Sequence, residues 1–187
     1  MNNQSKIFKF KFFSIIFVFI LGTLLHFTFE WSNQNAIIGS FSAINESTWE
    51  HLKLLFFPML ITTIIGYFYL GKSTPSFLCA RLLSIIFSII FTVVFFYTYT
   101  GILGTNIAIL NIATFYIATL IGEYISYRLM LSKFNCNTKK ALILLSILLF
   151  LFVLFTYFPP KIMLFKDPIS GTYGIIWKTV VHLKDIA

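Results

Sequence analysis

Histidine and carboxylate side chains gather in one short stretch of this sequence. Two of its three histidines and three of its six acidic residues lie between positions 26 and 51. Imidazole and carboxylate groups are side chains that bind Zn²⁺ and similar divalent ions. Four of these residues form the predicted metal site: His26, Glu30, Glu50 and His51. A catalytic zinc keeps one coordination position open for water, and Glu46 could then act as the general base.

The spacing of these residues both supports and limits a shared site. His26 and Glu30 are four positions apart, so they would share a helix face. Glu50 and His51 are adjacent and point about 100° apart on a regular helix, so both could bind one ion only if the first turn is irregular. The sequence has no H-E-x-x-H motif. The full candidate ligand-binding set is His26, Glu30, Asn45, Glu46, Glu50 and His51.

The same stretch also has an interpretation without any ligand. Ser47 and Glu50 match the S/T-x-x-E capping box, in which each side chain accepts a hydrogen bond from the other residue's backbone amide. Lys53 could pair with Glu50 three positions away. Trp31 and Trp49 are typical of anchors at a membrane surface. Helix capping and anchoring therefore stay open beside metal binding.

The composition indicates that lipid surrounds most of the chain. Of 187 residues, 58% are hydrophobic and only 11% are charged, and there are 24 Phe and 9 Tyr. Disorder needs low hydrophobicity and high charge, and a soluble domain of this size could not bury so much apolar surface. The formal net charge of +8 comes mostly from cations between apolar runs, which is typical of membrane topology. We therefore expect the lipid bilayer as a partner and no nucleic acid partner.

Five apolar runs are long enough to cross a bilayer as helices. The first would span about 27 Å at 1.5 Å per residue. Pro58 lies inside the second run and removes the amide that would bond the Leu54 carbonyl, so we expect a kink there. The predicted fold class is all-α, a single membrane domain over residues 1–187 with five transmembrane helices. The expected helices are residues 12–29, 52–70, 77–98, 107–129 and 141–158.

Positively charged residues predict the orientation of these helices. Lys and Arg occur before the first helix and in the loops after the second and fourth, whereas segments 31–44 and 100–106 contain neither. Cytoplasmic loops carry such an excess, so we predict a cytoplasmic N-terminus and an extracytoplasmic tail at 159–187. Within that tail, residues 175–183 are expected to form a short interfacial helix that includes Trp177.

The two cysteines are expected to be unremarkable in chemistry. Cys79 and Cys136 would both lie near the cytoplasmic face in this orientation. The cytoplasm is reducing, so a structural disulfide is not expected there. The residues also lack C-x-x-C or zinc-site spacing.

Small residues recur every four positions in the third and fourth helices, so each helix carries a ridge of small side chains. Such ridges let two helices approach closely in lipid. We predict that the two ridges face each other in an antiparallel hairpin. They consist of Ser84, Ser88 and Thr92 in one helix and of Thr114, Ala118, Gly122 and Ser126 in the other.

Glu123 lies beside the second ridge, inside an apolar helix. A lone carboxylate in hydrocarbon becomes protonated or finds a partner. Arg81 enters the third helix from the same side and could reach it, and Tyr127 could donate a hydrogen bond. We expect an Arg81–Glu123 intramembrane pair that clamps the helices, with a proton or ion relay as the functional alternative.

Two motifs resemble those of a known group of proteins. The first is N-E-S-T-W-E-H-L-K at positions 45–53, followed by Pro58, and the second is the tail with Pro159-Pro160, Asp167-Pro168 and Gly171-Thr172-Tyr173-Gly174. The sequence resembles, over nearly its whole length, an uncharacterised family of small multi-pass membrane proteins of Gram-positive, clostridium-like bacteria that carries a domain-of-unknown-function label. The resemblance implies an integral protein of the bacterial plasma membrane and supplies no activity or catalytic residues.

Three functions therefore stay open, and the sequence leaves undecided whether the protein is an enzyme. The first is binding or transport of a small solute or ion at the outward His/Glu cluster. The second is a membrane-embedded, metal-dependent hydrolase that uses the same residues, with zinc or a similar ion as cofactor. The third is a structural or accessory subunit, and a homodimer or a membrane-protein partner is consistent with so small a bundle. Asp167, in a predicted turn, could return to the cluster.

Overall fold

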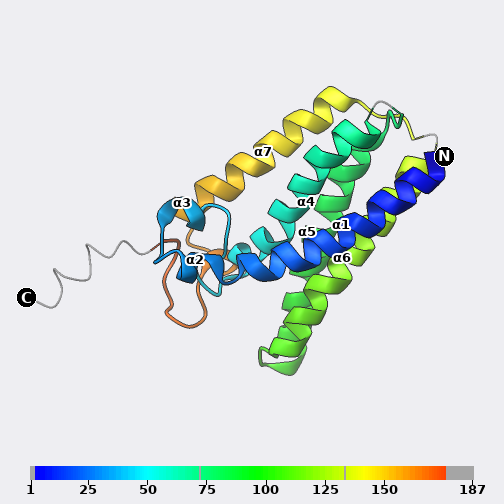
Figure 1. Ribbon diagram of the computed structural model, residues 1–187. Coiled ribbons are helices and arrows are strands. Elements are labelled where there is room, and N and C mark those ends of the chain that lie inside the picture. The colour runs from blue at the N-terminus through cyan, green and yellow to red at the C-terminus, as the bar shows by residue number, and fades with distance from the viewer. Residues whose placement is uncertain (1–2, 72, 133, 176–187) are drawn as a thin grey trace, which may run out of the picture.

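The computed structural model describes residues 3–71, 73–132 and 134–175, and long helices form most of it (Figure 1). Five of these helices are long and apolar enough to cross a membrane, which confirms the predicted all-α architecture. Their bounds are α1 Asn3–Leu25, α4 Thr48–Leu70, α5 Phe77–Leu103, α6 Ala108–Leu131 and α7 Thr138–Tyr157. Three single turns accompany them: α2 Thr28–Trp31, α3 Ala36–Gly39 and the 3-10 helix η1 Met163–Phe165.

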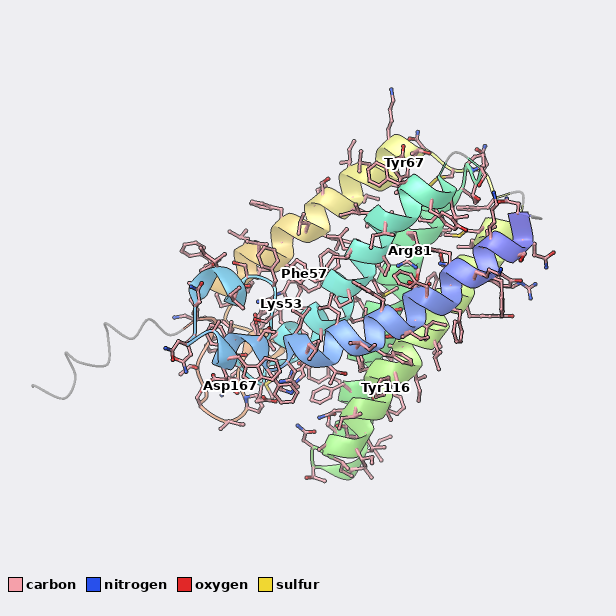
Figure 2. The ribbon with its side chains drawn as sticks, viewed as in Figure 1. Lys53, Phe57, Tyr67, Arg81, Tyr116 and Asp167 are labelled. Carbon is pink, nitrogen blue, oxygen red and sulfur yellow. A yellow bond between two sulfur atoms is a disulfide. The ribbon has the colours of Figure 1, made fainter. Side chains whose placement is uncertain are left out.

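The bundle has two different ends (Figure 2). At the end that we call the polar end, α2, α3, the start of α4 and residues 158–175 come together, and Lys53 and Asp167 lie there. At the opposite end, which we call the lysine end, lie the start of α1 and the last turns of α4, including Tyr67. Nearly all of the predicted tail helix at 175–183, including Trp177, lies outside the described residues.

The first helix differs from its predicted range. It begins at Asn3 rather than at residue 12, and it ends at Leu25 rather than at residue 29. Apolar runs mark the part of a helix that faces lipid, but lysine is also a good helix former, so the helical backbone continues through the charged start. Lys11 therefore belongs to the bundle interior and is only 4% exposed.

Helices α5 and α6 form the predicted antiparallel hairpin. Gly104, with φ of 66°, ends α5 in the left-handed conformation that glycine adopts readily. The Ser88 Oγ atom donates a hydrogen bond to the Ala118 carbonyl at 2.8 Å. A Cβ atom at Gly122 would overlap the Ser88 hydroxyl and lie 3.0 Å from the Ser84 carbonyl oxygen. The two small-residue ridges thus face each other, as predicted.

The backbones of helices α1 and α4 approach each other closely at Gly22 and Leu54. Pro58 supplies no amide for the Leu54 carbonyl, and that carbonyl faces Gly22 of α1. A Cβ atom at Gly22 would lie 2.5 Å from the Leu54 oxygen and 2.5 Å from Phe115 Cζ, so only glycine fits. His26 lies four residues after Gly22, and His51 lies three residues before Leu54, so this close approach brings the segment after α1 against the first turn of α4.

Aromatic rings attach α7 and the tail to α4. Trp49 stacks on Phe152 with ring centroids 4.5 Å apart, and its centroid lies 4.7 Å from that of Phe165. Phe56 also stacks on Phe152, with ring centroids 4.3 Å apart. Trp49 is therefore part of a packed cluster rather than a surface anchor, whereas Trp31 is 68% exposed, as an anchor would be.

A disulfide joins Cys79 in α5 to Cys136 before α7, so the expectation of no disulfide is wrong. The expectation rested on the reducing cytoplasm and on the spacing of the two cysteines in the sequence. The fold places the two Cα atoms 6.0 Å apart, within the range that a disulfide spans. The orientation of the bundle stays a prediction, and a disulfide at the lysine end is unusual for a cytoplasmic face.

Candidate metal centre

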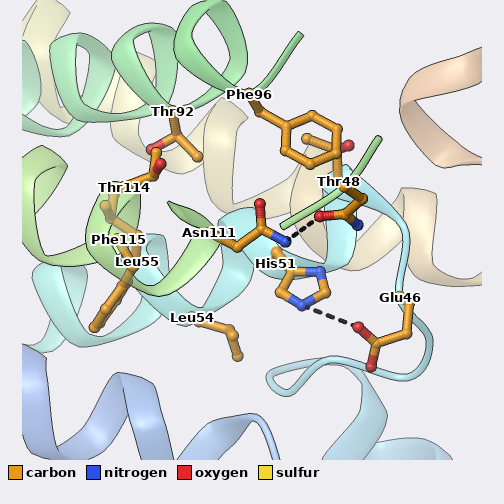
Figure 3. Close-up of a pocket in the computed structure, with 11 residues that line it drawn as sticks. Glu46, Thr48, His51, Leu54, Leu55, Thr92, Phe96, Asn111, Thr114 and Phe115 are labelled. Carbon is orange, nitrogen blue, oxygen red and sulfur yellow. Dashed lines mark hydrogen bonds and ion pairs between the residues drawn. The ribbon is translucent and has the colours of Figure 1, made fainter. Parts of the chain in front are cut away.

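His26, Glu46 and His51 come together at the polar end from three separate segments. His26 lies in the turn after α1, Glu46 lies in the loop before α4, and His51 lies in the first turn of α4. One ligand atom from each residue lies within 4.8 Å of the others. The His51 Nε2 atom is 3.4 Å from the Glu46 carboxylate, as Figure 3 shows, and the two imidazole centroids are 5.2 Å apart.

A backbone carbonyl orients the His51 ring. Its Nδ1 atom lies 3.0 Å from the carbonyl oxygen of Ser47, the N-cap residue of α4. We assign the Nδ1 proton to this hydrogen bond, because a carbonyl can only accept. The Nε2 lone pair then faces Glu46 and is free to bind a cation, which is the arrangement found around many metal-binding histidines.

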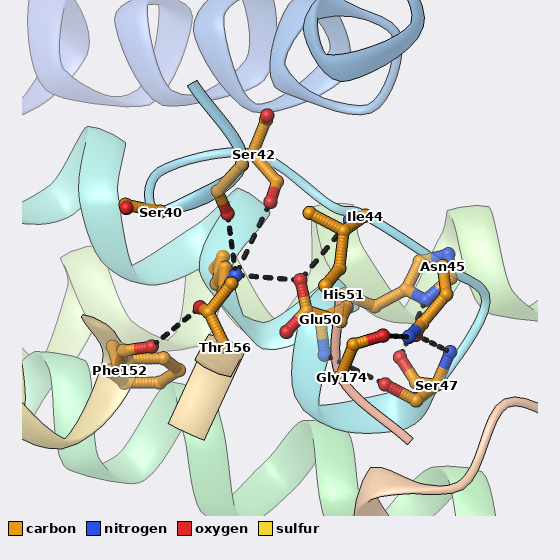
Figure 4. A network of polar contacts seen from close by, with 12 residues as sticks. Ser40, Ser42, Ile44, Asn45, Ser47, Glu50, His51, Phe152, Thr156 and Gly174 are labelled. Atoms are coloured by element: carbon orange, nitrogen blue, oxygen red, sulfur yellow. Dashed lines mark hydrogen bonds and ion pairs between the residues drawn. The ribbon is translucent and has the colours of Figure 1, made fainter. Parts of the chain in front are cut away.

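Glu50 does not belong to this group, although the sequence predicted it as a ligand. Its carboxylate accepts hydrogen bonds from Lys53 Nζ at 2.6 Å and from the Ile44 amide at 3.1 Å (Figure 4). Lys53 Nζ also donates to the Gly39 carbonyl at 2.9 Å, and both charged side chains are fully buried. The first turn of α4 is regular, so Glu50 points away from its neighbour His51. The predicted Glu50–Lys53 contact is present.

Glu30 also lies apart from the group. The predicted face that it shares with His26 requires a continuous helix, but α1 ends at Leu25 and α2 begins at Thr28. The Glu30 carboxylate is exposed and accepts a hydrogen bond from the Gln34 side chain at 3.4 Å. The prediction that Glu30 is a metal ligand is therefore not supported by its position.

Asn45 and Ser47 shape the loop that carries Glu46. Ser47 Oγ accepts the Glu50 amide at 3.3 Å, which is the predicted N-cap. The reciprocal half of the capping box is absent, because the Ser47 amide donates to Asn45 Oδ1 at 3.0 Å instead. Asn45 Nδ2 donates to the Gly174 carbonyl at 3.4 Å, so Asn45 connects the loop to the tail. Asn45 thus positions the site and does not face the cluster.

Asp167 supports the same loop from the tail. Its carboxylate accepts hydrogen bonds from the amides of Ile169 at 3.1 Å and Ser170 at 3.2 Å, and it also accepts one from the Glu46 backbone. Burial raises the pKa of Asp167, but the Ser170 side chain and these amides outweigh it and hold the pKa below its usual value. The predicted return of Asp167 to the cluster is thus a backbone contact with Glu46.

A cavity of about 90 Å³ opens beside Glu46 and His51 (Figure 3). One water needs roughly 10–15 Å³ on this measure, so several waters or a small solute fit. A wider vestibule of about 730 Å³ adjoins it and shares Glu46 in its wall. Polar side chains from three helices and a loop line the cavity: Thr48, Thr92, Asn106, Asn111 and Thr114.

The polar lining was not predicted from the sequence. Asn111 is the clearest missed residue, since an amide inside an apolar run signals an interior polar contact. Its Nδ2 atom donates to Asn106 Oδ1 at 2.7 Å, and Tyr99 hydroxyl donates to the same oxygen at 3.1 Å. These bonds hold the amide groups at the cavity wall.

A second polar cluster lies in the middle of the bundle. Arg81 Nη1 contacts both oxygens of Glu123 at 2.6 and 2.7 Å, so the structure brings the predicted pair together. Lys11 Nζ reaches the same carboxylate at 2.9 Å, and Ser14 Oγ donates to it at 2.8 Å. Tyr127 contacts the ring of Phe8 instead. Sequence reasoning missed Lys11 because it assigned this residue to the segment before the first helix.

The two clusters differ in what they can do. The guanidinium of Arg81 also donates to Thr63 Oγ1 at 2.9 Å, to Thr62 Oγ1 at 2.8 Å and to the Met59 carbonyl at 2.9 Å. The Lys11–Arg81–Glu123 cluster is therefore enclosed and hydrogen-bonded throughout. The His26–Glu46–His51 group keeps ring nitrogens and a carboxylate available beside a cavity.

Comparison with known proteins identifies a family and no characterised relative. No curated protein and no solved structure matches the chain. The sequence model described as a family of unknown function (DUF6512) matches residues 1–175. Because this match covers most of the sequence, the chain belongs to that family, in agreement with its membrane architecture.

Proposed function

We propose that this membrane protein binds a divalent transition-metal ion, Zn²⁺ or a similar ion, at its polar end through His26, Glu46 and His51. The observation that carries the proposal is the convergence of three ligand atoms within 4.8 Å of one another. Two imidazoles and one carboxylate suit zinc, copper, iron or nickel better than magnesium or calcium, which prefer oxygen ligands.

The site would leave the ion accessible. Three protein ligands occupy three positions of a tetrahedral ion, so the fourth is left for water or a solute. The cavity beside Glu46 and His51 provides the space for that ligand, and the vestibule connects it to the tail region. Binding of a metal ion, alone or together with a small solute, is therefore the activity that the geometry supports.

Binding is favoured over hydrolysis. The predicted hydrolase uses Glu46 as the general base, but here Glu46 is needed as a ligand. The Glu50 carboxylate is paired with Lys53, and the Glu30 carboxylate accepts a hydrogen bond from the Gln34 side chain. Among the described residues Glu46 is the one carboxylate in the wall of the cavity beside His51, so a carboxylate base in that cavity would have to be a residue that the metal site already uses.

Metal content and Zn²⁺ titration of the detergent-purified full chain test the proposal. The wild-type protein should hold about one zinc per chain, and His26→Ala and His51→Ala should each weaken Zn²⁺ binding at least about ten-fold. Glu30→Gln is the matched control, because it removes an exposed carboxylate at the same end without touching the group. Equal binding by wild type and both histidine variants would overturn the proposal.

A further inference from the structure

An apolar groove lies at the lysine end, between α4 and α7. Its volume is about 380 Å³, and most of the residues that line it are apolar, including Ile64, Leu142 and Leu149. Ile64 is 53% exposed and Leu142 is 55% exposed. Both helices are candidate membrane spans, so the groove opens towards hydrocarbon rather than water.

Polar groups lie at one end of this groove. Lys139, in the first turn of α7, and Tyr67, in the last turn of α4, both line it. The Lys139 ammonium and the Tyr67 hydroxyl have no hydrogen-bond or ion-pair partner among the residues that the structure describes. The groove is thus apolar along most of its length and has a cation and a hydroxyl donor at one end.

No carboxylate of the described chain neutralises this end of the groove. Glu123 is already shared by Lys11 and Arg81 in the bundle interior. The other described acidic residues lie at the polar end: Glu30, Glu46, Glu50 and Asp167. The exposed ammonium groups of Lys139 and its neighbour Lys140 therefore make this end of the groove positively charged.

The disulfide holds the charged end of the groove in place. Cys136 lies two residues before Thr138, which lines the groove, and Cys79 follows Leu78, which lines it from α5. The covalent bond therefore ties the segment that leads into α7 to the base of α5. Lys139 is presented at the groove by a fixed chain segment.

We propose that the groove between α4 and α7 binds an anionic phospholipid, with an acyl chain along the apolar wall and the phosphate at Lys139 and Tyr67. An acyl chain matches the hydrocarbon-facing surface, and a phosphate group complements the positive charge of Lys139 and Lys140. A zwitterionic lipid would place its own ammonium group near Lys139 and Lys140, so charge complementarity selects a lipid with net negative charge. This inference does not depend on the metal site.

The test compares lipids on the delipidated full chain in a neutral detergent. Phosphatidylglycerol should raise the melting temperature, whereas phosphatidylcholine of the same acyl length should raise it less. Lys139→Ala should weaken phosphatidylglycerol binding, measured by native mass spectrometry, at least about ten-fold, and Ser146→Trp should do so by filling the groove. Lys161→Ala, an exposed lysine at the polar end, is the matched control and should bind like wild type.

Two results would overturn the proposal. One is equal binding of the two lipids by the wild-type chain. The other is unchanged phosphatidylglycerol binding by Lys139→Ala. Lys139 is exposed, so its replacement disturbs no internal contact and the test stays decisive even if Ser146→Trp fails to fold.

Discussion

The Lys11–Arg81–Glu123 cluster in the bundle interior is enclosed, whereas the His26–Glu46–His51 group at the polar end is open. In the interior, Lys11, Arg81 and Glu123 have side chains that are 6% exposed or less, and serines, threonines and a carbonyl complete their hydrogen bonds. At the polar end, the side chains of His51 and Glu46 are 32% and 43% exposed, and they adjoin a cavity. A cluster whose charged groups are all hydrogen-bonded to one another can stabilise helix packing. A ligand site needs side chains that still have a lone pair or a charge available for the ligand.

The largest expected effect comes from breaking the enclosed cluster. Glu123→Gln leaves two cations near each other with no anion, and uncompensated buried charge costs about 3–5 kcal/mol. We expect a strong loss of thermal stability in detergent and reduced recovery of monodisperse protein on size exclusion. A Glu123→Gln variant as stable as Glu30→Gln would show that the cluster does not hold the bundle together.

The adjacent residues Glu50 and His51 allow a direct comparison of the two kinds of site. Glu50→Gln leaves Lys53 buried without its anion, so stability should fall by about 3 kcal/mol. His51→Gln should change stability by about 1 kcal/mol or less but weaken Zn²⁺ binding at least about ten-fold. Thermal denaturation and Zn²⁺ titration of both variants measure this. The reverse assignment, with metal loss in Glu50→Gln alone, would move the ligand set back to Glu50.

Replacing Gly122, next to Glu123 in α6, should lower the stability of the bundle by a slightly smaller amount. Gly122→Val inserts a side chain where the Ser88 hydroxyl and the Ser84 carbonyl already lie, and overpacking of this kind costs about 1–3 kcal/mol. Gly101→Val is the matched control, because a Cβ atom at Gly101 meets nothing within 4 Å. Equal melting temperatures for the two valine variants would contradict the close approach of α5 and α6.

The smallest expected effect concerns the tail that supports Glu46. The pKa of Asp167 is lower in the folded protein than its ordinary 3.8, so its hydrogen bonds add stability above that pH and lose it as the pH falls through the folded value. Asp167→Asn should therefore reduce stability by about 1 kcal/mol at pH 7 and by progressively less below pH 3.8. Melting curves of both proteins from pH 7 to pH 3 test this, and a difference that grows towards acid pH would contradict it.

The candidate site was predictable in part, and the limits have physical causes. The clustering of histidines and glutamates in the sequence predicted a site at the end of the bundle where His26, Glu46 and His51 lie together, and the predicted ligands included His26 and His51. Glu30 was predicted from its spacing to His26 along a continuous helix, but α1 ends at Leu25. Glu50 could join His51 only if the first turn of α4 were irregular, and that turn is regular. Glu46, proposed as a base, lies where a ligand would be, because the Asn45 and Asp167 contacts fix its loop.

Five helices long and apolar enough to cross a membrane, the Ser47 cap and the small-residue hairpin could be predicted from the sequence alone, because apolar length, capping and four-residue spacing are local properties of the chain. The tertiary structure decided which charged groups meet. Lys11 reaches Glu123, and Cys79 meets Cys136, only after separate helices pack. Contacts between distant segments depend on packing geometry such as the close approach of Gly22 to Leu54, and no local pattern records that geometry.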